Sequence, residues 1–324
     1  MCLHNQCMVV IMTKNKSARV LLYIIIITAF ASLLLYPTDI IAGINKGIDL
    51  SVKIIIPSLF CFFVLSEMLT SLPFPKMIEK LFTPVTRLLF GIGGSCVLPF
   101  MLGCICGFPV AAKSASDMYK NGKISKREAS ILLYFCNNAS ASFIIISVGF
   151  IMHKSMKTGI YLYLIQLLSS VITGIILSRT NKKDKIMRDN SILKIKTNKI
   201  NIFELLVNNI RSAAVNMLYV CAFVVFFSAV SGIANKVFSF FKYRNIILGF
   251  IEMTNALSLM SESVSMSEMT LVSFILSISG LCVIMQISAM LYNSGLSIKN
   301  VILGKTLQSA IAVMITLISF NIIL

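Results

Sequence analysis

Seven uncharged and mostly apolar stretches divide this chain of 324 residues. A helix that crosses a lipid bilayer needs about 18 or more predominantly apolar residues, and every one of these stretches is long enough. An eighth stretch, 54–72, contains a single charged residue, Glu67. The pattern therefore predicts an all-α polytopic membrane protein. The seven uncharged stretches are 20–38, 88–112, 129–152, 158–178, 212–235, 269–298 and 306–324.

The composition excludes the common soluble classes of protein. Charged residues make up 13% of the chain and hydrophobic residues 57%, whereas a soluble domain is about 25% charged. A soluble fold of this size cannot bury so much apolar surface in one core. The formal net charge of +17 is therefore interpreted as an orientation signal in the membrane, and no nucleic-acid partner is expected.

Positive charge also predicts the domain organisation, because Lys and Arg accumulate on the cytoplasmic side of a membrane. A basic segment precedes residue 20, and two more lie at 113–127 and 179–201. All three are predicted to be cytoplasmic. The first membrane half contains an extra helix at 20–36 and a repeat unit at 52–178. The chain is therefore predicted to consist of a cytoplasmic N-terminal segment 1–19, a first membrane half 20–178, a basic cytoplasmic linker 179–201 and a second membrane half 202–324.

The stretch 88–112 must begin and end on the same side of the membrane under this charge assignment. A re-entrant hairpin satisfies that condition, and its tip is predicted at 91–95, where glycines allow a sharp reversal. Interrupted backbone at membrane depth persists only when it is buried in protein or lines a wet cavity. For residues 246–290, a hairpin and a full span both remain open. The second arm of the predicted hairpin carries the helix breakers Pro99, Gly103, Gly107 and Pro109.

The second half of the chain resembles the first in the order of its elements. At an offset of 173 residues, Gly107, Tyr119 and Gly122 are matched by glycine, tyrosine and glycine in the second half. The stretches 54–72 and 212–235 are predicted to run in opposite directions. Together these features predict an inverted repeat, an architecture of many secondary transporters, with about six full spans and two re-entrant or broken hairpins.

Polar residues inside apolar stretches are the candidate site residues, because each is costly in a bilayer unless it is paired or solvated. The densest group lies at 135–142 and predicts an unwound segment that faces a polar ligand, with hydrogen bonding between helices as the alternative. Lys113 either contacts an anion or extends to the membrane surface. The candidates are Ser95, Gly107, Pro109, Lys113, Asn137, Asn138, Ser140, Ser142, Glu252, Thr254, Asn255, Ser279, Gly280 and Gln286.

Glu67 and Glu252 are acidic residues in otherwise apolar surroundings. An ionised carboxylate at the centre of a bilayer costs about 3 kcal/mol. Ion coupling or proton transfer is the functional interpretation, and a position near the membrane surface is the alternative.

The sequence carries no catalytic or nucleotide-binding signature such as HExxH, GxSxG or a Walker loop. None of the nine cysteines forms a Cys-x-x-Cys pair, and the only two histidines are His4 and His153. The chain is therefore not expected to be an enzyme or to hold a cofactor or metal.

Several motifs resemble the YlbJ-like sporulation integral membrane proteins, which are placed among proteins with a nucleoside-recognition gate domain. The chain departs from that pattern in places: Ala139, Ser140 and Ala141 stand where the family has serine, glycine and proline after the asparagine pair. The matching motifs are PSLF at 57–60 with Glu67, GCICGFPVAAK at 103–113, GKISKRE at 122–128, FCNNASASFIIISVG at 135–149, GFIEMT at 249–254 and SGLCVIMQ at 279–286.

The resemblance implies a multi-pass protein of endospore formation, located in the outer forespore membrane, that moves dipicolinate towards the forespore. Helix N-termini, Ser and Asn donors and a nearby cation suit a dianionic acid. The residues themselves leave two interpretations. One is a secondary carrier or facilitator for a small anionic metabolite, with nucleosides or other metabolites as alternative cargo. The other is a membrane scaffold that recruits sporulation partners and transports nothing. A coupling ion and a homo-oligomer remain open.

Overall fold

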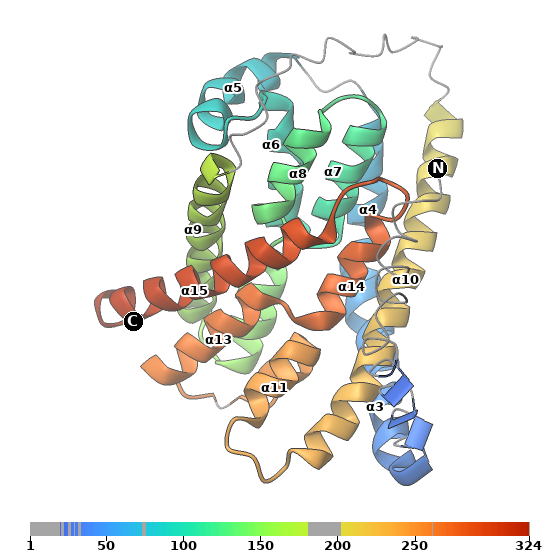
Figure 1. The fold of residues 1–324 in the computed structure, drawn as a ribbon, viewed down its shortest axis with the longest axis vertical. Helices are drawn as coiled ribbons and strands as arrows, with labels where there is room; N and C mark the ends of the chain where they lie inside the picture. Colours follow the sequence, from blue (N-terminus) through green and yellow to red (C-terminus); the bar gives the residue numbers. More distant parts are fainter. Residues whose placement is uncertain are drawn as a thin grey trace.

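A computed structural model describes residues 34–72, 76–180, 202–260 and 262–323, with scattered positions between 20 and 31. All regular secondary structure in these ranges is helical (Figure 1). Four helices are long and apolar enough to cross a membrane, and the number rises to six if each of two bent helix pairs is one span. The predicted all-α polytopic membrane fold is therefore confirmed. Seven of the 17 positions of the predicted extra helix at 20–36, and residues 181–201 of the predicted linker, lie outside the described residues.

The first half begins with α3 (Pro37–Leu50), which continues through a π-helical turn, η1 (Ser51–Ile55), into α4 (Ile56–Ser71). Pro57 lies at the start of α4. A proline has no backbone N–H to donate, and π-helical turns commonly accommodate such a disturbance of the helical ladder. The helix is thus distorted at 51–55 but not ended.

The next helix, α5 (Lys76–Phe90), is amphipathic. It exposes an apolar stripe formed by Met77, Leu81, Val85 and Leu88, as expected for a helix that lies in the membrane interface. After α5 the chain bends by 87°. It then passes through the short turn η2 (Gly94–Cys96) into α6 (Val97–Ile105). Gly91 has a φ of 66°, a conformation that glycine adopts without strain.

The structure corrects the predicted hairpin. Residues 91–95 form a corner, whereas the chain reverses at 106–109, between α6 and α7 (Val110–Lys120). Pro109 lacks the N–H that would extend α6, and Gly107 has a φ of 94°. The hairpin packs tightly because a Cβ atom at Gly103 would overlap both Ala111 and the Cys136 carbonyl. The tip therefore lies at the Gly-Phe-Pro motif.

The predicted unwound segment is present. The helix α8 (Lys126–Phe135) begins with a capping box between Ser125 and Glu128, and residues 136–140 after it are not helical. Helical structure resumes at residue 141 and continues as the π-helix η3 (Phe143–Met152), which is followed by α9 (Met156–Thr180). The span that begins with α8 is thus interrupted at its two asparagines.

The second half begins with the long α10 (Ile202–Val237), followed by α11 (Arg244–Ile251) and the short α12 (Met253–Leu257). Glu252 alone separates α11 from α12. The next two helices, α13 (Met266–Ile278) and α14 (Gly280–Met290), meet at Ser279 and together form one candidate span. Residues 246–290 therefore contain a short interrupted helix and then an interrupted span. The last helix is α15 (Ile298–Ile323).

Small residues let α10 pack closely along α3 (Figure 1). A Cβ atom at Gly43 would lie 2.6 Å from the Ser228 carbonyl oxygen, and one at Gly47 would lie 2.7 Å from the Val225 Cα. Two glycines four residues apart are a common means of close helix contact in membranes.

The two ends of the molecule provide a test of the predicted orientation. The α7–α8 connection lies with α5 at one end, and α3 and α11 lie at the other (Figure 1). We expect Cys at position 120 or 185 to be labelled from the cytoplasmic side and Cys at position 154 from the opposite side. The measurement is labelling with an impermeant thiol reagent in a cysteine-free background. Labelling of positions 120 and 154 from the same side would contradict this topology.

Candidate functional site

The helices of this protein are interrupted at 106–109, at 136–140, at Glu252 and at Ser279, and these four interruptions meet in pairs inside the protein. A Cβ atom at Gly107, in the hairpin tip, would lie 3.0 Å from the Ser140 backbone nitrogen, in the unwound segment. A Cβ atom at Gly280, beside the second-half break, would lie 2.6 Å from the Gly249 carbonyl oxygen, near the end of α11. Each half of the chain thus brings two breaks into direct contact.

A buried hydrogen-bond network joins the two halves, and Asn138 is its centre. The Asn138 Oδ1 accepts hydrogen bonds from Gln308 Nε2 at 2.9 Å and from Gln166 Nε2 at 3.5 Å. Its amide nitrogen donates to Ser170 Oγ at 3.1 Å. Ser277, two residues before the break at Ser279, donates to Gln166 Oε1 at 3.2 Å. Gln166 therefore connects both interrupted spans.

Lys305 of α15 extends this network. Its side chain is 2% exposed, and its Nζ donates to Gln308 Oε1 at 3.2 Å. The same Nζ lies 5.7 Å from the centre of the Phe108 ring, in the hairpin tip. A cation from α15 thus reaches the point where the hairpin and the unwound segment meet.

The other predicted residues of the unwound segment have different environments. Asn137 is 1% exposed; its amide nitrogen donates to the Leu133 carbonyl at 3.2 Å, and its Oδ1 has no hydrogen-bond partner in the described part of the chain. The hydroxyls of Ser140 and Ser142 lie 3.3 Å apart, and Ser142 is exposed. Asn137 is the one of these three with a buried acceptor left free, an arrangement that is rare in folded proteins.

Glu252 caps a helix in the second half. Its two carboxylate oxygens accept the backbone N–H groups of Thr254 at 2.9 Å and Asn255 at 2.7 Å. The carboxylate is 3% exposed, and Lys46 of α3 lies close enough to attract it electrostatically. This arrangement satisfies the backbone donors that begin α12.

A pocket of about 210 Å³ opens between α3, α10 and the α11–α12 unit. Asn255 lines it together with Ser231 and Asn235 of α10, and each of these side chains has one buried oxygen that finds no hydrogen-bond partner among the residues that the structure describes. The Asn255 amide nitrogen donates to Ser228 Oγ at 3.3 Å. Of the predicted residues Glu252, Thr254 and Asn255, only Asn255 lines this pocket. Within the described residues, no hydrogen bond links the three to the Asn138 network.

The remaining second-half candidates surround the break in the second interrupted span. Ser279 has a φ of 66° and is fully buried, and its hydroxyl donates to the Leu276 carbonyl at 3.1 Å. Gln286 is 4% exposed and donates to Cys282 Sγ at 3.3 Å. Neither side chain takes part in the hydrogen bonds around Asn138.

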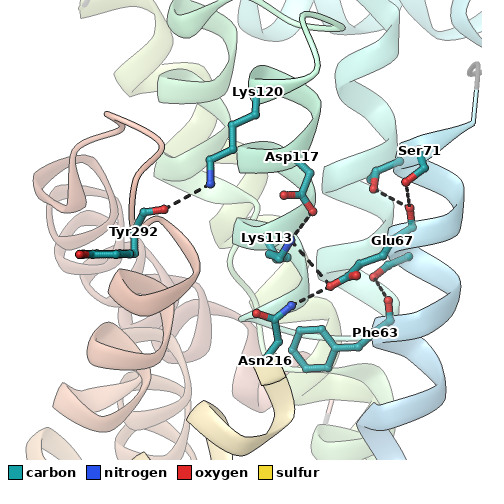
Figure 2. Close-up of polar contacts among 10 residues, drawn as sticks. Phe63, Glu67, Ser71, Lys113, Asp117, Lys120, Asn216 and Tyr292 are labelled. Atoms are coloured by element: carbon teal, nitrogen blue, oxygen red, sulfur yellow. Dashed lines mark hydrogen bonds and ion pairs between the residues drawn. The ribbon is translucent and has the colours of Figure 1, made fainter. Parts of the chain in front are cut away.

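The predicted residue Lys113 belongs to a partly buried ion cluster in the hairpin (Figure 2). Its Nζ lies 2.6 Å from Asp117 Oδ2, one turn later in α7, and 3.7 Å from Glu67 Oε1 of α4. Asn216 of α10 donates to the same Glu67 oxygen at 2.7 Å. Lys113 is therefore paired within the protein, and the cluster fastens the hairpin to α4 and α10.

Two predicted residues of the first half complete the set. Ser95 lies in the corner between α5 and α6, where its hydroxyl donates to Glu79 Oε1 at 3.5 Å, and it takes no part in the Asn138 network. Pro109 is the N-cap residue of α7, directly behind the hairpin tip.

The sequence interpretation missed Gln166, Ser170, Ser277, Lys305 and Gln308. A signal was available for Lys305, because it lies between apolar residues well inside the 298–323 helix. Searching for uncharged stretches made this lysine the boundary of the stretch 306–324. A helical pattern that tolerates one charge would have placed it inside a span.

The comparison with known proteins follows this geometry. The chain is 24% identical to "Sporulation integral membrane protein YlbJ" of Bacillus subtilis (strain 168) over 319 residues, which cover 87% of this chain and 78% of the relative. The resemblance to YlbJ-like proteins is confirmed. No protein-family model matches the chain, and no solved structure matches it.

The ion cluster leads to a prediction about stability. Replacement of Lys113 by Met leaves the buried carboxylate of Glu67 and the half-buried carboxylate of Asp117 without their cation, and removing one partner of a fully buried ion pair costs about 3–5 kcal/mol. We expect the unfolding temperature of the detergent-solubilised protein to fall by several degrees. Lys120→Met is the matched control, since Lys120 is exposed on the same helix and donates only to the Tyr292 carbonyl (Figure 2). Equal shifts for both variants would contradict the structural role of the cluster.

Proposed function

We propose that this protein is a secondary carrier or facilitator for a small anionic metabolite and that it acts in endospore formation. The observation that carries this proposal is that the hairpin tip, the unwound segment and the span broken at Ser279 meet at one buried polar network. Secondary transporters use interrupted helices in this way, because unwound backbone near the membrane midplane offers polar groups to a substrate. A scaffold would need no such interruption, and buried polar groups destabilise a membrane protein unless they are satisfied.

The similarity to a sporulation integral membrane protein supports the biological setting. We propose the outer forespore membrane as the location and dipicolinate as the cargo. A dicarboxylate is compatible with a site that holds a buried lysine and several amide and hydroxyl donors. The inverted arrangement of the two halves is part of the same proposal, because each half supplies an interrupted span followed by a long uninterrupted helix, α9 or α15.

Transport itself is tested by uptake into vesicles that contain the purified protein. Labelled dipicolinate, nucleosides and other small organic acids are offered in parallel, and protein-free vesicles are the control. We expect dipicolinate uptake that saturates with concentration. If none of these compounds enters faster than in protein-free vesicles, the carrier proposal is wrong and the scaffold interpretation gains support.

A strain that lacks the gene gives an independent prediction in the cell. If the protein moves dipicolinate towards the forespore, its spores should contain little dipicolinate and appear grey in phase-contrast microscopy. Restoring the gene should restore the content. A normal dipicolinate content in the deletion strain would exclude this cargo but would leave other anions open to the uptake assay.

The role of Asn138 is predicted from its central position in the network. Asn138→Ala removes the acceptor for Gln308 and Gln166, and a lost neutral hydrogen bond costs about 0.5–1.5 kcal/mol. We expect about two- to twelvefold weaker apparent affinity in the uptake assay, normalised to the amount of protein in the vesicles. Asn121→Ala, at an exposed asparagine after α7, is the control. Unchanged uptake by Asn138→Ala would make Asn138 a packing residue.

A further inference from the structure

Lys305 differs from the lysines that form ion pairs in this structure. Lys53, Lys113 and Lys154 each lie within 4.0 Å of at least one carboxylate. Lys305 is more deeply buried than any of them, and no carboxylate of the described residues forms an ion pair with it. Its hydrogen-bond acceptor is a neutral amide oxygen, Gln308 Oε1.

This environment does not balance a positive charge. An ammonium group has three N–H donors, and Gln308 accepts one of them. The Phe108 ring adds a contact at 5.7 Å to the ring centre, which attracts a cation only weakly. A buried charge without a counter-charge is strongly unfavourable, and in membranes such residues face a partner or a substrate path. The protein thus presents a cation whose partner is missing from its own described residues.

The surroundings of Lys305 are those of a ligand site. Phe108 lies in the hairpin tip, next to Gly107, which contacts the unwound segment at Ser140. Gln308 uses its amide nitrogen to bind Asn138 and its amide oxygen to bind Lys305. The amide orientation is therefore fixed by both neighbours. Gln308 positions the lysine, and two of the three N–H groups of Lys305 have no acceptor among the described residues.

We propose that Lys305 binds the carboxylate of the small organic acid that this protein carries, with Gln308 as its positioning residue. This inference rests on the proposed carrier function and names the group that selects the cargo by its charge. An ammonium–carboxylate contact in a site without bulk water is among the stronger polar contacts, and a neutral analogue of the same shape cannot form it. The site should therefore discriminate strongly between an acid and its amide.

The test measures binding to the purified full-length protein in detergent. Labelled dipicolinate is the probe, and pyridine-2,6-dicarboxamide, a neutral analogue of similar shape, is the competitor. For the wild type we expect saturable dipicolinate binding with little competition from the diamide. Lys305→Met, which keeps an unbranched side chain but removes the charge, should weaken dipicolinate binding at least tenfold. Lys299→Met, at an exposed position on the same helix, should bind as the wild type does.

A second variant keeps the test decisive if Lys305→Met folds poorly. Gln308→Glu places a carboxylate where the Lys305 acceptor now lies, 3.2 Å from Nζ. The introduced carboxylate should compete with the ligand for Lys305 and weaken dipicolinate binding at least tenfold. Because it also pairs with the lysine, the unfolding temperature of this variant should be maintained or raised. Wild-type affinity in either folded variant, or equal binding of the diamide and the acid to the wild type, would overturn the role of Lys305.

The result also separates this inference from the carrier proposal. Wild-type protein that binds and transports dipicolinate, together with a Lys305→Met variant that does so equally well, would remove Lys305 and leave the carrier intact. Wild-type protein that neither binds nor transports dipicolinate, benzoate or other small carboxylates would remove both.

Discussion

The structure depends on the rule that backbone N–H and C=O groups inside a membrane must find partners within the protein. Interruptions at Gly107, in the segment after Phe135, at Glu252 and at Ser279 each release such groups. The protein accommodates them by placing each interruption against another and by adding side chains that supply the missing partners. Glu252 is the clearest case, because its carboxylate receives the first free N–H groups of α12.

Uninterrupted helices pack against these interruptions and fix their positions. In the second half of the chain, α15 crosses over α8, α9 and α13 and brings Lys305 and Gln308 to the unwound segment. In the first half, α9 contributes Gln166 and Ser170 from the other side. A polar network between rigid helices is well ordered, and when it is fully satisfied it specifies one arrangement of the core. A ligand can then exploit the few groups that remain free.

The buried charges follow two different principles. Lys113 is neutralised by Glu67 and Asp117, so its cluster connects the hairpin to α4 and α10. Lys305 has a neutral amide as its partner, so it remains competent to attract an anion. Lys113 thus connects helices because carboxylates neutralise it, whereas Lys305, which has no neighbouring carboxylate among the described residues, is the lysine that we propose to bind an anion.

The sequence alone determined the membrane class, the unwound segment at the asparagine pair and the resemblance to YlbJ-like proteins, because hydropathy and helix breakers act over short distances along the chain. Only the tertiary structure decided which breaks meet and which charges are paired. Glu67 and Asn216 are 149 residues apart, and Asn138 and Gln308 are 170 apart. The hairpin tip was misplaced because Gly91 and Gly107 carry the same local signal and both have a positive φ. Only the fold, in which Gly103 packs against the Cys136 carbonyl, shows that the chain reverses at Gly107. A helical pattern that tolerates one charge would have placed Lys305 inside a span, but only the folded protein shows that no carboxylate of the described residues lies beside it.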